Sequence, residues 1–193
     1  VLGSAVVNAT PDVAVVNIGI ENLNENINVA VEENNETMSK IIDYLKSIGI
    51  TEENIQTKNY SVYQRYHYSD GEKFLGYQVD NSLEFKTTDL QNLSSVLTKL
   101  TDLGANRLGG ITFTCSDLEN YYNKALKLAL ENAKSKMKSL TDETLSVCKI
   151  EEKSLYSNEI YRDSAFVLAR ANKESIVKGS LQIEAKIEVK FCN

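Results

Sequence analysis

The stretch LQIEAKIEVKF, residues 181–191, alternates apolar and polar side chains at every position. Successive side chains of a β-strand point to opposite faces, so this period of two predicts a strand with one buried and one solvent-facing side. A strand of that kind is typical of antiparallel sheets whose second face is wet. The C-terminal stretch therefore predicts an antiparallel sheet that is covered on one face only.

Similar strand patterns lie upstream of this stretch. Pro11, the only proline, marks a turn between the first two of them. The Asp70-Gly71 step lies between two alternating runs and predicts a hairpin. The predicted strands cover residues 2–8, 13–20, 59–68, 77–87 and 108–115, followed by two less regular stretches at 148–156 and 160–168.

Three longer stretches repeat their apolar residues at helical spacing, over residues 26–48, 90–103 and 118–141. Gly49 and Gly104 follow the first two, where a left-handed residue commonly ends a helix. Ser116 or Asp117 is placed to cap the third. The sequence thus predicts an α+β fold in which antiparallel or mixed sheets pack with about three helices. We expect one domain over residues 1–193, with a subdivision allowed near 142–178.

Composition excludes several classes of protein. The chain has 193 residues, of which 42% are hydrophobic and 25% charged, as in ordinary globular proteins. Its 27 acidic and 21 basic residues give a net charge of −6, which disfavours nucleic acid as a partner. Lys134, Lys136 and Lys138 are interpreted as a solvated helix face. No apolar run reaches the roughly 18 residues that a membrane-spanning helix needs.

The three cysteines are Cys115, Cys148 and Cys192, and they include no CxxC pair. Their number leaves room for one disulfide, but their spacing matches no standard zinc site. Cys115 shares its strand face with Ile111 and Phe113, which favours a small buried hydrophobe over a zinc ligand beside His67 and Cys148. Cys192 falls on the polar side of the last strand, so we expect it to be the most exposed thiol, and this position permits an intermolecular bridge without requiring one.

No pattern of catalytic residues emerges. His67 is the only histidine and lies beside the predicted hairpin turn, where we expect it to be exposed. No serine or cysteine has a nucleophile signature such as GxSxG, and no phosphate-binding loop is present. Adjacent acids such as Glu151 and Glu152 do not face each other across a substrate. The sequence therefore predicts no catalytic residues, no cofactor and no metal site.

Tyrosines gather in the predicted hairpin, and tyrosine combines a large apolar area with a hydroxyl group, as protein interfaces favour. The general preference of tyrosine for strands is the alternative explanation. The candidate interaction surface comprises Tyr60, Tyr63, Tyr66, Tyr68 and Tyr77.

Short motifs recur in a fixed order from Gly3 to Phe191. They are Pro11-Asp12, Gly49-Ile50, Ile55-Gln56-Thr57, Gly76-Tyr77, Gly104-Ala105-Asn106, the alanines Ala125, Ala129 and Ala133, and Gly179 before the last strand. In this order they resemble the SIMPL-domain family of mainly bacterial cell-envelope proteins. The resemblance implies an α+β fold, export to the periplasm, envelope or cell surface, and a tendency to self-assemble. The family has no established reaction, so it implies no catalytic residues here.

Three functional hypotheses follow. The first is a non-enzymatic cell-envelope or secreted protein, with its signal peptide removed, that acts as a homo-oligomer or by binding a partner. The second is a small-molecule-binding module in stress protection. The third is a hydrolase without a recognisable motif.

Overall fold

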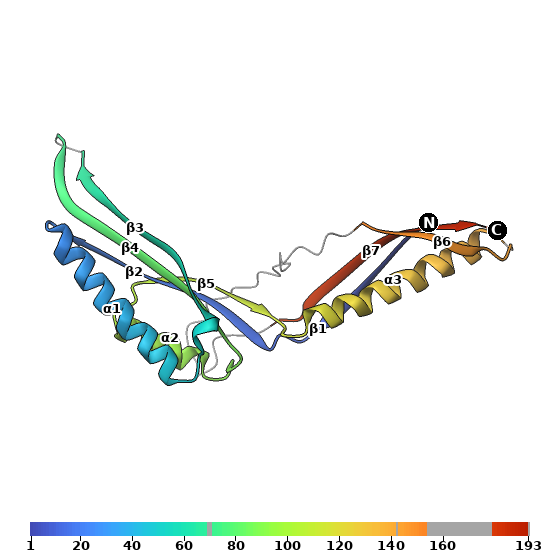
Figure 1. Cartoon of the computed structure of the whole chain (residues 1–193), viewed down its shortest axis with the longest axis horizontal. Helices are drawn as coiled ribbons and strands as arrows, with labels where there is room; N and C mark the ends of the chain where they lie inside the picture. The colour runs from blue at the N-terminus through green and yellow to red at the C-terminus, as the bar shows by residue number, and fades with distance from the viewer. Residues whose placement is uncertain (69–70, 142, 154–178, 193) are drawn as a thin grey trace. The chain divides into compact units, whose positions relative to one another are not determined.

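A computed structural model describes residues 1–68, 71–141, 143–153 and 179–192 of the chain (Figure 1). These residues form helices and antiparallel strands, which confirms the predicted α+β class. The elements in chain order are β1 (Leu2–Ala9), β2 (Val13–Asn24), α1 (Ile27–Ser47), η1 (Glu52–Asn54), β3 (Ile55–His67), β4 (Lys73–Thr87), α2 (Leu93–Asp102), β5 (Arg107–Thr114), α3 (Leu118–Leu140), β6 (Ser146–Glu152) and β7 (Leu181–Cys192).

The described residues divide into two compact units, each with its own sheet and core. The first unit contains β1, α3, β6 and β7, and the second contains the elements from β2 to β5. The single domain expected over residues 1–193 stays a prediction. The strand expected at 160–168 lies outside the described residues.

The first unit is a three-stranded sheet in the order β1-β7-β6, with α3 running along one face (Figure 1). The predicted alternation of β7 is confirmed, because its inward side chains from Ile183 to Val189 are buried against α3. Close approach of helix and strand depends on small residues. A Cβ atom added at Gly3 would lie 2.1 Å from the carbonyl oxygen of Ala129, so helix backbone and strand backbone nearly touch.

The second unit is a four-stranded sheet in the order β3-β4-β2-β5, with α1 and α2 sharing its core (Figure 1). Large side chains fill this core, with Phe85 and Ile18 of the sheet and Leu45 of α1 almost fully buried. Gly49 has a φ of 90° and follows the end of α1, as predicted.

Several element boundaries differ from the predicted ones, among them the starts of β3 at Ile55 and of β4 at Lys73, which were expected at residues 59 and 77. The second helix begins at Leu93 rather than near Leu90, because the Asp89 carboxylate accepts hydrogen bonds from the backbone and side chain of Asn92 in the preceding turn. Strand β5 ends at Thr114. Cys115 is buried as predicted, but in the core of the first unit, whereas Ile111 and Phe113 pack against the core of the second. The expected shared face was wrong.

Candidate interaction surface

Strand β3 lies at one edge of the four-stranded sheet, where it pairs with β4 alone among the described strands. Most of its side chains are exposed on both faces of the sheet. Tyr60 is 46% exposed and Tyr63 is 39% exposed, and Tyr68, just beyond the strand, reaches 71%. An edge strand with exposed aromatic rings offers both backbone groups and apolar area to a partner.

A β-bulge shapes the hairpin. Arg65 lies opposite Gly76, but Tyr66 lies opposite Phe74, so Leu75 is an extra residue on β4. Gly76 has a φ of 137°, and a Cβ atom there would lie 2.7 Å from the carbonyl oxygen of Asn24. Glycine is therefore required at this position, for its backbone conformation and for space.

The bulge gathers four aromatic rings, which we call the aromatic row: Tyr66, Tyr68, Phe74 and Tyr77. The ring centroids of Phe74 and Tyr77 are 5.4 Å apart, in an edge-to-face arrangement. Tyr66 lies 5.5 Å from Phe74 and 6.3 Å from Tyr68. Such edge-to-face and tilted contacts restrict the orientations of the rings. Phe74 was missed in the sequence because the predicted strand began at Tyr77, although its neighbours Leu75 and Gly76 signal a strand with a bulge.

Tyr63 points to the opposite side of the sheet. Its hydroxyl group donates a hydrogen bond to the Asp80 carboxylate at 2.9 Å, and Gln78 donates to the same carboxylate at 3.3 Å. The Arg107 guanidinium lies 3.3 Å from both Asp80 and Glu21. We call Glu21, Tyr63, Gln78, Asp80 and Arg107 the polar clasp, since it connects β3, β4, β2 and β5.

The polar clasp has a structural explanation. The Asp80 side chain is only 13% exposed, and three donors satisfy it. Loss of solvent around Tyr63, together with its hydrogen bond to Asp80, raises the pKa of the phenol. The hydroxyl group therefore stays protonated and keeps its donor role. The predicted tyrosines thus divide into two sets, with Tyr63 in the clasp and Tyr66, Tyr68 and Tyr77 in the aromatic row.

Tyr60 belongs with the aromatic row by its direction. Tyr60 and Gln64 lie on the same side of β3, and Gln64 is opposite Tyr77 in the register. Tyr60 therefore extends the face of the aromatic row along the edge strand.

A buried asparagine, Asn34, lies on the inward face of α1. The Asn34 side-chain amide donates to Asn22 Oδ1 at 2.8 Å, and also lies 3.4 Å from the Val79 carbonyl oxygen. Its own Oδ1 atom has no hydrogen-bond partner among the described residues. The sequence carried one signal for this feature, since Asn34 falls on the inward side of the helical repeat with Met38 and Ile41.

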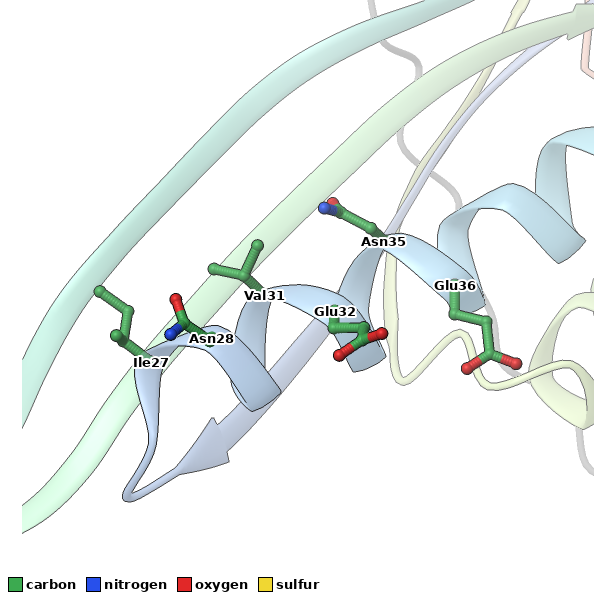
Figure 2. Close-up of a pocket in the computed structure, with 6 residues that line it drawn as sticks. All are labelled: Ile27, Asn28, Val31, Glu32, Asn35 and Glu36. Atoms are coloured by element: carbon green, nitrogen blue, oxygen red, sulfur yellow. The ribbon is translucent and has the colours of Figure 1, made fainter.

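A shallow hollow runs along α1 (Figure 2). Every side chain that lines it comes from this helix, and the hollow is open to solvent. The lining residues are Ile27, Asn28, Val31, Glu32, Asn35 and Glu36. A hydrolytic site needs polar groups that converge from separate segments, and the hollow does not supply them.

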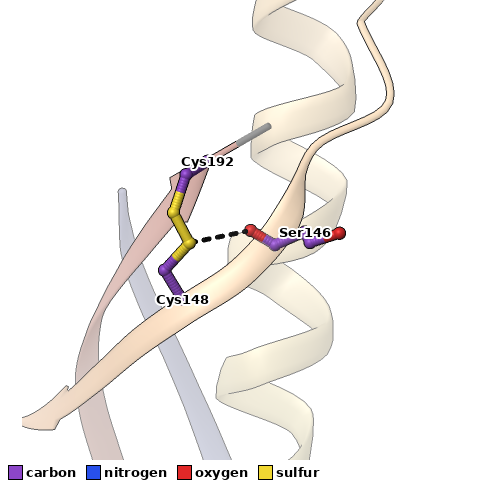
Figure 3. The surroundings of a disulfide bond; sticks show 3 residues. All are labelled: Ser146, Cys148 and Cys192. Atoms are coloured by element: carbon purple, nitrogen blue, oxygen red, sulfur yellow. Dashed lines mark hydrogen bonds between the residues drawn. A yellow bond between two sulfur atoms is a disulfide. The ribbon is translucent and has the colours of Figure 1, made fainter.

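The structure pairs Cys148 with Cys192 in a disulfide, with Cα atoms 6.1 Å apart (Figure 3). Cys148 occupies a register shift in β6, beside the end of β7, where Ser146 lies opposite Cys192. The one disulfide that the number of cysteines allowed is therefore formed within the chain. The expectation that Cys192 is the most exposed cysteine was wrong, since Cys148 is exposed and Cys192 is partly buried. The sequence could not show this because the pairing of β6 with β7 is a long-range contact.

The remaining candidate groups are not arranged as a reaction centre. Cys115 is buried, and burial raises the pKa of its thiol. His67 is exposed on β3, as expected. Lys149 and Lys153 form ion pairs with Glu151 and lower the pKa of its carboxyl group to about 2. Over the ranges that the structure describes, no three His, Cys, Asp or Glu side chains come together to hold a metal ion.

Within the described residues, the helices are too short or too polar to cross a membrane.

Comparison with known proteins gives a match over almost the whole chain. The model of the SIMPL family, described as a protein of unknown function (DUF541), matches residues 1–191. The 26 kDa periplasmic immunogenic protein of Brucella melitensis is 30% identical over 148 residues, which cover 74% of this chain and 59% of the relative. The uncharacterized protein YggE of Escherichia coli K12 is 27% identical over 132 residues, covering 68% of this chain and 54% of that protein. The chain thus spans less than two thirds of these relatives.

Proposed function

Because this chain belongs to the SIMPL family, whose function is unknown, we propose that it is a non-enzymatic envelope or secreted protein that self-assembles. The contact surface is the aromatic row together with the outer edge of β3. The observation that carries this proposal is the exposed aromatic row, held in place by the Gly76 bulge on an edge hairpin.

The chemistry of this surface suits association. Phe74 is 39% exposed and Leu75 is 37% exposed, next to partly buried Tyr66 and Tyr77. Monomeric proteins seldom leave contiguous apolar surface uncovered without a use. The open edge of β3 adds backbone donors and acceptors that a further strand can pair with.

Two observations support a location outside the cytoplasm. The Cys148–Cys192 disulfide suits an oxidising compartment, since such bonds are rare in the reducing cytosol of most organisms. The Brucella melitensis relative is named as a periplasmic protein.

The test is the absolute mass of the purified protein, measured by size-exclusion chromatography with light scattering over a range of concentrations. The double variant Tyr66→Ser and Phe74→Ser removes two rings of the aromatic row. We expect its mass to fall relative to the wild type, because the apolar contact area is lost. Leu23→Ser is the matched control, since Leu23 is an exposed apolar residue of the same unit outside the row. An unchanged mass with an intact fold counts against this surface.

Small-molecule binding has one supporting observation, the hollow along α1 with Ile27 and Val31 beside Glu32. A thermal-shift screen tests it, because a ligand that binds only the folded state raises the melting temperature. Flat responses to a broad library exclude this second candidate.

A further inference from the structure

A stripe of lysines runs along the solvent face of α3. The inward side of this helix is set by Ala125, Ala129 and Ala133, which are buried against the sheet. Lys127, Lys134 and Lys138 are exposed on the other side. In the described part of the chain, none of these three forms an ion pair. They form a positive surface on a protein whose net charge is −6.

An acidic stripe runs along the solvent face of α1. The inward side of α1 carries Met38, Ile41 and Leu45. Glu32, Glu36 and Asp43 are exposed on the outward side, and Glu32 and Glu36 lie one turn apart along the helix (Figure 2). The chain therefore carries two long helices with outward faces of opposite charge.

The sequence spacing of the acids along α1 is the reverse of the spacing of the lysines along α3. On α1, the acids follow one another after four and then seven residues. On α3, the lysines follow after seven and then four. With a rise of 1.5 Å per residue, these steps correspond to about 6 Å and about 10 Å along each helix. Two helices laid antiparallel therefore bring all three pairs into register at once.

We propose that α3 of one copy docks antiparallel on α1 of a second copy, with Lys138 opposite Glu32, Lys134 opposite Glu36 and Lys127 opposite Asp43. This contact rests on the proposed self-assembly and supplies a second surface for it. A twofold dimer would make this contact twice, and repetition of the contact in one direction would give a closed ring or an open chain.

The neighbouring charges include one of the opposite sign on each face and one pair of like charges. Lys40 lies 2.7 Å from Glu36 on α1, and Glu131 lies between Lys127 and Lys134 on α3. Each of the two facing surfaces therefore carries one charge of the opposite sign. Lys124 would approach Lys46, whose ammonium group lies 3.4 Å from Glu52. The Glu52 carboxylate reduces that repulsion.

Exposed ion pairs are weak singly and are screened by salt. Their main effects are on orientation and on the rate of encounter. The contact is therefore expected to be salt-sensitive, whereas the aromatic row, which acts through apolar burial, is not.

Charge reversal tests the contact. One triple variant is K127E, K134E and K138E, a second is E32K, E36K and D43K, and a third chain carries all six changes. Light scattering at about 0.02 M and about 0.5 M salt reports the mass of each. We expect the wild-type multimer to shrink at high salt, and each triple variant to need at least about tenfold more protein to reach the same mass. The variant with all six changes is expected to recover wild-type association, since its acidic α3 meets a basic α1.

A net-charge control separates pairing from general charge effects. Lys86→Glu, Lys99→Glu and Lys190→Glu change the total charge by the same amount as the α3 reversal, at exposed positions outside the stripe. This control is expected to keep the wild-type mass. Circular dichroism of every variant confirms that the fold is retained.

The outcomes distinguish this contact from the proposed function. If the triple variants keep the wild-type mass while the Tyr66 and Phe74 changes lower it, the helix contact is wrong and self-assembly stands. If the variant with all six changes associates no better than the triple variants, the proposed pairing of the α3 lysines with the α1 acids is wrong. A wild-type protein that is monomeric at every concentration and salt overturns both.

Discussion

The two units differ in the side chains that the helix presents to the sheet: the middle of α3 buries alanines, whereas α1 buries larger residues such as Met38, Ile41 and Leu45. In the first unit, Ala129 of α3 lies so close to β1 that only glycine fits at position 3. In the second unit, Phe85, Leu83 and other large side chains fill the space between α1 and the sheet. An added methyl group is expected to strain the first core at its closest point. A removed side chain is expected to leave a cavity in the second core. The same layer arrangement can thus be stabilised by close backbone approach or by bulky filling.

The largest expected effect is a deletion in the bulky core. Phe85 is fully buried in the second unit, so Phe85→Ala leaves a cavity and is expected to lower the free energy of unfolding of that unit by about 3–5 kcal/mol. Hydrogen exchange, measured in each unit at increasing urea concentration, gives the loss in the free energy of unfolding. Protection in the first unit should change much less, and equal losses in both units would contradict two separate cores.

A smaller effect is expected from an addition to the tight core. Gly3→Ala places a methyl group against the backbone of α3, and overpacking of this kind typically costs about 1–3 kcal/mol. The same hydrogen-exchange experiment should show the loss in the first unit. Gly110→Ala is the matched control, because a Cβ atom there meets nothing within 4 Å. If Gly3→Ala were as mild as Gly110→Ala, close backbone approach would not be what stabilises this unit.

The smallest effect concerns the polar clasp, a feature of the second unit. Tyr63→Phe removes the hydroxyl group that donates to Asp80 while keeping the ring, and is expected to cost about 1 kcal/mol. Tyr60→Phe removes a hydroxyl group that lies outside the polar clasp, and this variant serves as the comparison and should be close to neutral. Matching values for the two variants would mean that the clasp contributes nothing to stability.

Features of the fold that depend on single residues or near neighbours could be predicted from the sequence. Gly49 and Gly104 end helices because glycine takes the left-handed conformation without strain, a property of a single residue. The Leu181–Phe191 alternation indicated a half-buried strand because side-chain direction in a strand depends only on position. Tyr66, Tyr68 and Tyr77 were also recognised, and the structure brings them together.

The sequence by itself therefore determined the class of fold, the family, most helix ends and the tyrosine-rich hairpin. The tertiary structure decided the sheet orders, the edge position of β3, the Gly76 bulge that adds Phe74 to the aromatic row, and the partner of Cys192. It also turned Tyr63 away from the other tyrosines and into the polar clasp. The physical reason is range, since propensity and periodicity act between near neighbours, whereas strand order, bulge register and disulfide partner depend on residues far apart in the chain.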